Sequence, residues 1–171
     1  LNIKHVDLKS NTLYFSAHGV NKTIDPYYEH TYKVNLSGGK PKVLNNGNYN
    51  TSTQPSDNHK YFVNNFSRVS TVPKSELRNS DGSLVMSLEE ADLSELFNSG
   101  YQFPETFKAK AEDGITDLYG VMYKPFNFDE KKKYPLLEYV YPGPQTESVN
   151  KSFSVRMDRL DRMAQLGFVV I

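Results

Sequence analysis

The histidines are the side chains best suited to acid–base or metal chemistry, and all of them lie in the first half of the chain, at His5, His18, His30 and His59. Asp25 and Glu29 lie close to His30 in the sequence, which suggests a metal-ligand group. No paired spacing such as His-x-x-x-His accompanies them, however. We therefore interpret Asp25, Glu29 and His30 as a solvated loop and strand edge, and His59 as a turn residue. No metal or cofactor site is predicted.

A complete set of hydrolytic residues is absent from the sequence. A nucleophilic serine on a sharp strand-to-helix turn is usually framed as Gly-x-Ser-x-Gly, and none of the ten glycines frames that pattern. There is no cysteine to serve as an alternative nucleophile. In α/β-hydrolases the acid and the histidine follow the serine along the chain, whereas here no histidine follows Tyr61. We therefore expect this chain alone to be inactive.

Tyr141 is the one candidate for a catalytic role. It ends an apolar run, residues 136–141, and is followed by a rigid Pro-Gly-Pro sequence. Loops at the carboxyl ends of strands form the active sites of open α/β sheets. A tyrosine hydroxyl at such a position can donate a hydrogen bond to a developing oxyanion. The residues by themselves favour the simpler explanation, an ordinary tyrosine at the end of a buried strand followed by a turn.

The first hundred residues predict short antiparallel strands separated by turns. The expected strands span residues 11–17, 28–36, 41–44, 49–54, 61–66, 70–77 and 84–88. Asp81-Gly82 between two of them is a strong hairpin signal, because glycine tolerates the positive φ of a tight turn. Two rounds of about four strands, each of about 40 residues, have the period of β-propeller blades. A small β-sandwich is the alternative.

The remaining residues predict a different architecture. A short helix over residues 91–97 is expected to end at Gly100, and a hairpin over residues 105–123 is expected to turn at Asp113-Gly114. A strand over 136–141, a helix over 154–166 and a strand over 168–171 follow, with Lys131–Lys133 in a solvated loop. This β–loop–α–β order indicates a parallel sheet covered by helices. The fold class is therefore mixed, with blades over residues 1–103 and the opening of an α/β domain over residues 104–171, both incomplete.

Composition excludes several classes of function. Twenty basic residues balance twenty acidic ones, so no charge excess favours nucleic acid or an anionic membrane. The apolar runs are too short to span a bilayer. Aromatic residues make up 13% of the chain, and their alternation along strands favours packing inside the sheets over stacking on sugars. Five Asn-x-Ser/Thr sequons, which start at Asn21, Asn35, Asn50, Asn65 and Asn150, are attributed to an asparagine-rich composition.

The segment Tyr134-Pro-Leu-Leu-Glu-Tyr-Val-Tyr-Pro-Gly-Pro144 resembles the start of the catalytic domain in the prolyl oligopeptidase family of serine peptidases. It is most similar to the dipeptidyl-peptidase IV branch, with its Tyr-Pro-Leu/Val…Val-Tyr-x-Gly-Pro pattern. The turn over residues 55–61 resembles the Ser-Pro-Asp-Gly-Lys-Tyr turn of that family's blades, with Asn58-His59 in place of the glycine. Pro142 stands where relatives often have glycine or alanine.

The resemblance implies a piece of a larger serine exopeptidase, secreted or periplasmic, that releases dipeptides after a penultimate proline or alanine. Tyr141 would be its oxyanion-hole tyrosine, and the serine, aspartate and histidine would lie beyond Ile171. The resemblance implies a peptide substrate and no cofactor. A propeller-based binding or scaffold module, and a propeller-linked esterase or acylaminoacyl peptidase, are the alternatives. We also expect self-association through open sheet edges, because unpaired strand edges recruit other chains.

Overall fold

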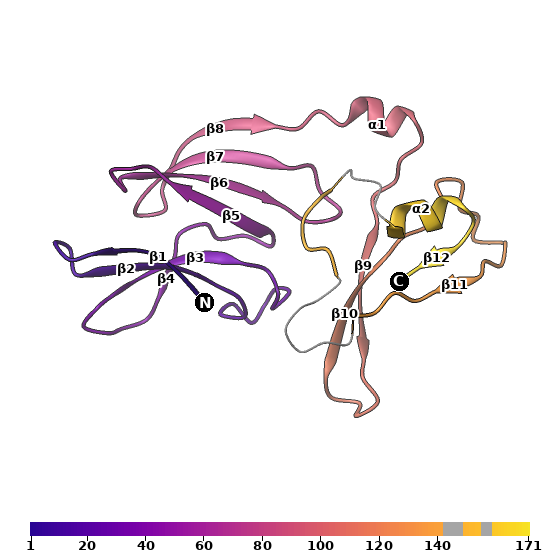
Figure 1. The fold of residues 1–171 in the computed structure, drawn as a ribbon, viewed down its shortest axis with the longest axis horizontal. Helices are drawn as coiled ribbons and strands as arrows, with labels where there is room; N and C mark the ends of the chain where they lie inside the picture. The colour runs from indigo at the N-terminus through magenta and orange to yellow at the C-terminus, as the bar shows by residue number, and fades with distance from the viewer. Residues whose placement is uncertain (142–148, 155–158) are drawn as a thin grey trace. The chain divides into compact units, whose positions relative to one another are not determined.

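The computed structural model describes residues 1–141, 149–154 and 159–171, and the chain forms two compact units (Figure 1). The first unit consists of Leu1–Arg68 and Pro73–Ala91. The second consists of Val69–Val72 and Asp92–Ile171, so the chain enters the second unit briefly before it returns to complete the first.

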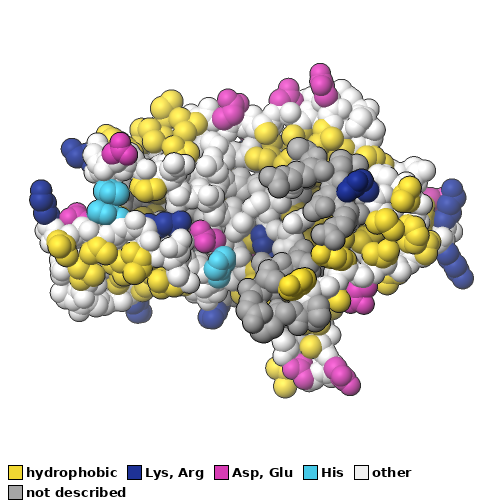
Figure 2. Space-filling model, viewed as in Figure 1, with side chains coloured by type: hydrophobic (Ala, Val, Ile, Leu, Met, Phe, Trp, Pro, Cys, Tyr) yellow, Lys and Arg dark blue, Asp and Glu magenta, His cyan; other side chains and the backbone are white. Residues whose placement is uncertain are grey.

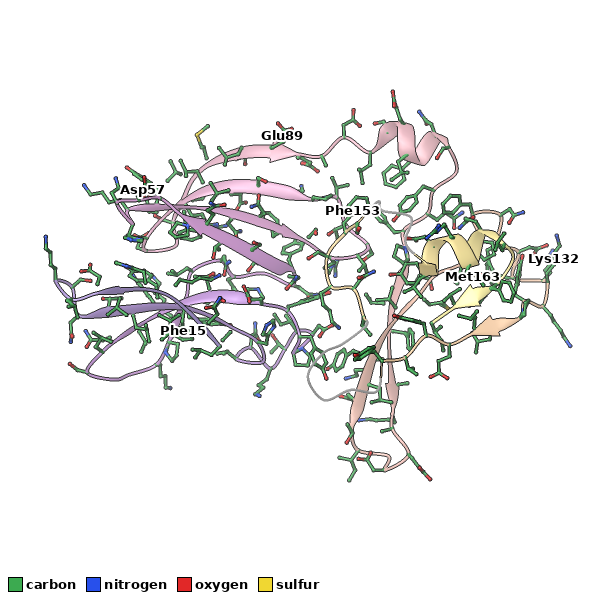
Figure 3. The ribbon with its side chains drawn as sticks, in the orientation of Figure 1. Phe15, Asp57, Glu89, Lys132, Phe153 and Met163 are labelled. Atoms are coloured by element: carbon green, nitrogen blue, oxygen red, sulfur yellow. The ribbon has the colours of Figure 1, made fainter. Side chains whose placement is uncertain are left out.

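The first sheet of the first unit contains four antiparallel strands in chain order: β1 (Asn2–Asp7), β2 (Thr12–Ala17), β3 (His30–Asn35) and β4 (Lys42–Val43). One aromatic residue from each of β2 and β3 lies on the same face of the sheet. Phe15 and Tyr32 are directly paired across the strands and their rings stack with centroids 5.6 Å apart. Together with Ala17 they form a buried cluster on this face of the sheet (Figure 3 labels Phe15).

The second sheet of the first unit repeats this arrangement with β5 (Asn50–Pro55), β6 (Tyr61–Ser67), β7 (Lys74–Asn79) and β8 (Leu84–Glu90). Gly82 has a φ of +92° in the turn between β7 and β8, which confirms the Asp-Gly hairpin. The strand predicted over residues 70–77 was placed too early, because Val69–Val72 belongs to the second unit. Two four-stranded antiparallel sheets in succession are consistent with propeller blades.

The second unit contains α1 (Ser94–Asn98), β9 (Glu105–Lys110), β10 (Asp117–Met122), β11 (Leu136–Leu137), α2 (Arg159–Gln165) and β12 (Val169–Val170). The helix predicted over 91–97 therefore begins later and ends before Gly100, whose φ is +94°. β9 and β10 form a long hairpin that projects away from α2, β11 and β12 (Figure 1). Gly114 allows its turn, with a φ of +68°.

A buried cluster holds α2 against the short strands. Ala164 on α2 and Val170 on β12 are fully buried, and Val69, Val121 and Tyr123 complete the cluster. Met163 of α2 and Leu137 of β11 pack against it from its margin (Figure 3 labels Met163). The helix ends at Gln165, before Gly167 with a φ of +99°, as its glycine predicts. The predicted start of the helix falls partly outside the described residues.

The strand predicted over residues 136–141 is shorter than expected and is not buried on both faces. The strand covers only Leu136–Leu137, and these two residues pair in parallel with β12, as the sequence predicts. Leu137 packs against the core, whereas Leu136 and Val140 are 63% and 62% exposed. The prediction of a buried strand was wrong because, in the part of the chain that the structure describes, nothing covers the face that carries these two side chains.

An aromatic cluster around Tyr101 forms a second centre of packing in this unit. The Tyr101 ring is 6% exposed and meets Phe126 and Phe153 edge to face, at centroid distances of 5.6 and 6.3 Å. Phe103 contacts both Tyr101 and Phe153 (Figure 3 labels Phe153). Burial, followed by the charge of Asp161, raises the pKa of Tyr101 to about 12. Its phenol therefore stays neutral and serves packing.

Candidate functional site

Tyr141 lies just beyond the carboxyl end of β11, at a point fixed by a hydrogen-bonded ladder. The N–H of Ile171 donates to Leu137 O at 2.9 Å, and the N–H of Tyr139 donates to Ile171 O at 2.7 Å. This parallel pattern continues the pairing of β11 with β12 as far as Tyr139. Tyr141 follows two residues later, and its side chain is 56% exposed. The backbone leading to this tyrosine is thus held while its side chain remains accessible.

On its other side, β12 is hydrogen-bonded to Tyr123, the residue that follows β10. Tyr123 forms an antiparallel bridge with Val170, in which each N–H donates to the other's carbonyl at 2.8 and 3.0 Å. Three segments therefore lie side by side in the order Tyr123, β12 and β11. The Pro142-Gly143-Pro144 sequence that follows Tyr141 lies outside the described residues.

This arrangement supplies one hydrogen-bond donor to a reaction centre. A phenol at a strand end can stabilise a developing oxyanion if a nucleophile and its base approach from elsewhere. The sequence contains no Gly-x-Ser-x-Gly turn and no histidine in the second unit. Tyr141 could therefore be one component of a catalytic site but not the whole of it.

His30 lies in a different environment from the one predicted. It begins β3, an interior strand of the first sheet, and is only 2% exposed. Its Nε2 atom lies 3.0 Å from Gly47 O. Burial is the main cause that lowers the pKa of His30 below its ordinary value. The interpretation of His30 as a solvated strand edge was wrong, because a strand edge is set by sheet order, which the sequence around His30 does not show.

The neighbouring acids have local structural partners. Asp25 Oδ1 accepts a hydrogen bond from the N–H of Tyr27 at 2.9 Å, which forms a turn. Glu29 Oε2 lies 3.7 Å from His18 Nε2. Among the residues that the structure describes, no group of three potential metal ligands of the His, Cys, Asp or Glu type occurs. Asp25, Glu29 and His30 therefore do not converge on one point.

His59 occupies a turn, as predicted, but also makes a contact that the sequence did not reveal. Its φ of +53° lies in the left-handed region, which residues other than glycine adopt only uncommonly. Its ring stacks on that of His5 from β1, with centroids 3.6 Å apart and planes inclined by 12°. Both rings line a cavity of about 40 Å³ together with Tyr14 and Tyr61. Figure 2 shows the histidine side chains, in cyan, over the first unit.

The remaining candidate features, the lysine loop and the tyrosines of the strands, differ in their exposure to solvent. Lys131–Lys133 are exposed in a loop, as predicted, and the Lys132 side chain points into solvent (Figure 3). Tyr28 and Tyr32 are buried, whereas Tyr27 and Tyr61 are about half exposed. Over the described part of the chain, no helix has the length and apolar character needed to cross a membrane.

Comparison with known proteins identifies relatives of both halves of the chain. Residues 1–73 match the family model described as the dipeptidyl peptidase IV N-terminal region. Dipeptidyl peptidase 8 of Homo sapiens is 43% identical over 72 residues, which are 42% of this chain and 8% of that protein. "Probable dipeptidyl-aminopeptidase B" of Trichophyton verrucosum is 30% identical over 181 residues, covering 97% of this chain and 18% of the relative.

The chain spans less than a fifth of the length of these curated relatives. The family model covers the first sheet and much of the second, while the fungal similarity continues through the strand that leads to Tyr141. The sequence motif at residues 134–144 points to the same group of proteins. The chain belongs to the dipeptidyl-peptidase IV branch of the prolyl oligopeptidase family.

Proposed function

We propose that this chain is part of a serine-type dipeptidyl peptidase that releases Xaa-Pro and Xaa-Ala dipeptides from the amino terminus of peptides. The names of its relatives support the peptidase class. The observation that carries the proposal for this chain's own residues is that Tyr141 lies two residues beyond the last hydrogen bond that continues β11, with its hydroxyl-bearing side chain accessible. The nucleophile, its base and the orienting acid would be supplied by parts of the enzyme outside these 171 residues.

Within this proposal, residues 1–103 are the C-terminal part of a β-propeller and residues 104–171 the start of an α/β-hydrolase domain. The order Tyr123, β12, β11 supports the second assignment, because β12 forms an antiparallel bridge with Tyr123, which follows β10, and pairs in parallel with β11. The chain from β11 to β12 passes through α2, as in a strand–helix–strand crossover. Such units build the parallel sheets of α/β enzymes.

Tyr141 would act on the tetrahedral intermediate of acyl transfer. When the serine attacks the scissile carbonyl group, the carbonyl oxygen gains negative charge. The Tyr141 hydroxyl would donate a hydrogen bond to this oxygen. Removing one such donor typically costs about 2.7–4 kcal/mol of transition-state stabilisation, a loss of about a hundredfold to a thousandfold in kcat. This hydrogen bond strengthens only as charge develops on the carbonyl oxygen. Its loss should therefore change the affinity for the substrate far less than it changes kcat.

The test is hydrolysis of a Gly-Pro chromogenic amide by the full-length encoded protein, by its Tyr141→Phe variant and by the 171-residue chain alone. The proposal expects activity in the full-length protein, a large loss of kcat in Tyr141→Phe, and no activity in the 171-residue chain. Equal kcat in the two full-length forms would remove Tyr141 from the mechanism. No cleavage by the full-length protein would favour a binding module, and a preference for blocked amino termini would favour an acylaminoacyl peptidase or esterase.

A further inference from the structure

Asn46 and Gly47 lie in the connection between β4 of the first sheet and β5 of the second, both within the first unit. Gly47 is the only one of the ten glycines that follows an asparagine. The Asn46 side chain is exposed, so water reaches its amide group. The peptidase reaction proposed above does not involve this pair, and its chemistry is therefore considered independently.

An Asn-Gly pair combines a reactive side chain with an accessible backbone nitrogen. Asparagine is a thermolabile residue, because the nitrogen of the following residue can attack its side-chain amide carbon. A glycine in that following position has no Cβ to shield the nitrogen and leaves the backbone free to rotate. Packing also requires glycine here, since a Cβ at Gly47 would lie 2.7 Å from the Tyr49 ring.

Hydrogen bonds do not restrain either reacting group. Among the residues that the structure describes, neither the Asn46 side-chain amide nor the Gly47 N–H has a hydrogen-bond partner. The attacking species is the deprotonated backbone nitrogen, and a hydrogen bond donated by the N–H would oppose both its deprotonation and its movement. The nitrogen of Gly47 is thus free to approach the Asn46 side chain.

Two Asp-Gly pairs, which are open to the same cyclisation, show the opposite arrangement. In Asp81-Gly82 the glycine N–H donates to Asn79 O at 2.8 Å, and in Asp113-Gly114 it donates to Ala111 O at 2.9 Å. Each aspartate Oδ1 also accepts the backbone N–H two residues further on, at 2.8 Å. Both reacting groups are therefore held in these turns, whereas both are free at Asn46-Gly47.

We propose that Asn46 is a deamidation site. The Gly47 nitrogen forms a bond with Asn46 Cγ, the Cγ–Nδ2 bond breaks, and ammonia leaves with the proton from the Gly47 amide. Water then opens the cyclic imide at either carbonyl carbon and supplies one oxygen of the new carboxylate. Opening at Cγ gives aspartate. Opening at the backbone carbonyl gives isoaspartate, whose main chain runs through Cγ and is one methylene longer.

The extra methylene falls between two contacts that hold the connection to β3. Asn45 is 2% exposed, and its Oδ1 accepts the N–H of Thr31 at 2.9 Å. Gly47 O lies 3.0 Å from Nε2 of the buried His30. A longer chain between residues 46 and 47 changes the spacing of these contacts, so at least one of them must shift. Because an unsatisfied buried polar group is destabilising, isoaspartate should loosen β3.

The experiment incubates the full-length protein at neutral pH in water enriched in the heavy oxygen isotope. Digestion with trypsin in ordinary water then releases the peptide between Lys42 and Lys60, and fragmentation by mass spectrometry locates the isotope. We expect a labelled aspartate or isoaspartate at Asn46, formed at least severalfold faster than at Asn48 in the same peptide. The rate should rise with pH, because the attacking nitrogen must lose its proton.

Asn46→Gln is the matched control, because it keeps a side-chain amide but would have to form a larger ring. It should take up no label at residue 46. An unlabelled Asn46 after prolonged incubation, or equal labelling of Asn46 and Asn48, would overturn the proposal. Labelling of Asp81 or Asp113 at the rate seen for Asn46 would contradict the protective role of their hydrogen bonds.

Hydrogen exchange of the incubated protein tests the structural consequence separately. The isoaspartate fraction should show faster exchange over residues 28–51, whereas incubated Asn46→Gln should exchange as it did before incubation. Deamidation at Asn46 with unchanged exchange would leave the site established and overturn the loosening of β3. Neither result depends on peptidase activity, so the proposed function is tested independently of this site.

Discussion

Asn45 Nδ2 donates a hydrogen bond to Asn64 Oδ1 at 2.9 Å, and the two side chains are 2% and 3% exposed. The same Nδ2 group donates to Thr51 Oγ1 at 2.9 Å, and Asn45 Oδ1 accepts the N–H of Thr31, also at 2.9 Å. Thr31 lies on β3 of the first sheet, whereas Thr51 and Asn64 lie on β5 and β6 of the second. One buried amide thus fixes two sheets of the first unit to each other.

Replacing this amide should therefore destabilise the first unit strongly. Asn45→Ala leaves the Thr31 N–H and Asn64 Oδ1 without their partners, and we expect it to lower the free energy of unfolding by about 2–4 kcal/mol. Hydrogen exchange of the amides in β3 and β5 measures the loss locally. Asn48→Ala, at an exposed residue of the same connection, should change exchange little. Equal protection in the two variants would contradict the role of Asn45.

Two Asp-Gly turns in this chain offer a matched test of close packing. Gly82 and Gly114 both have positive φ, but a Cβ at Gly82 would lie 2.7 Å from Leu44 O, whereas one at Gly114 meets nothing within 4 Å. Gly114→Ala should cost about 1–2 kcal/mol, from backbone strain alone. Gly82→Ala should cost more, because the Leu44 backbone must also shift. Denaturant unfolding of both variants provides the comparison, and a smaller loss for Gly82→Ala would contradict this packing.

The buried imidazole of His30 should make the first unit less stable in acid. Burial lowers the pKa of His30 in the folded state, whereas in the unfolded chain it should titrate near pH 6.5. Below that pH the unfolded chain binds a proton that the folded chain does not, so this contribution to stability is complete above about pH 6.5 and is lost as the pH falls. Hydrogen exchange of residues 28–51, measured at about pH 7.5 and 5.5 and corrected for intrinsic rates, should show this loss.

His30→Gln removes the titrating group and should flatten the pH dependence of that exchange. Asn48→Ala is the control, because Asn48 is an exposed residue of the same unit without a titrating side chain, and its replacement should leave the slope as it is in the unmodified protein. An unchanged slope in His30→Gln would assign the acid sensitivity to other groups.

β8 is expected to promote self-association of the 171-residue chain. It is the edge strand of its sheet and all seven of its residues are exposed, including Leu84 and Met86. Figure 2 shows hydrophobic side chains at this edge of the first unit. Light scattering should show a mass that rises with concentration, and Met86→Lys should reduce that rise because a charge on an edge strand opposes pairing. Val20→Lys, in a loop of the same unit, is the control and should not reduce the rise in mass. A monomer at all concentrations would contradict the prediction.

Local signals in the sequence were sufficient for much of the fold. The Asp-Gly pairs at residues 81–82 and 113–114 predicted both hairpin turns, because each requires a positive φ that glycine supplies. Gly100 and Gly167 predicted where α1 and α2 end. The parallel pairing of β11 with β12 followed from the strand–helix–strand order. For the candidate site, the parallel strand on the way to Tyr141 could be predicted, but not that it ends at Leu137, and the catalytic role of Tyr141 stays a prediction.

Features that depend on distant neighbours could not be predicted. His30 looks like a surface residue among polar neighbours, and only the sheet order makes it buried. Asn45, Thr51 and Asn64 are separated along the chain and resemble ordinary loop and strand residues, yet they form one buried network. The same applies to the hydrogen bond that Asn150 Nδ2 donates to the Tyr123 hydroxyl, because the two residues are 27 residues apart.

Val69–Val72 has a consequence for how this protein can be divided or recombined. The segment lies between β6 and β7 of the first unit, but Val69 is 4% exposed in the core of the second. The chain therefore passes from one unit to the other three times. A single cut at Asp92, whether by a protease or at a gene fusion point, would leave Val69 on a different piece of chain from the rest of the core it completes. An exchange of the second unit with that of a related protein would therefore have to include Val69–Val72 as well as Asp92–Ile171.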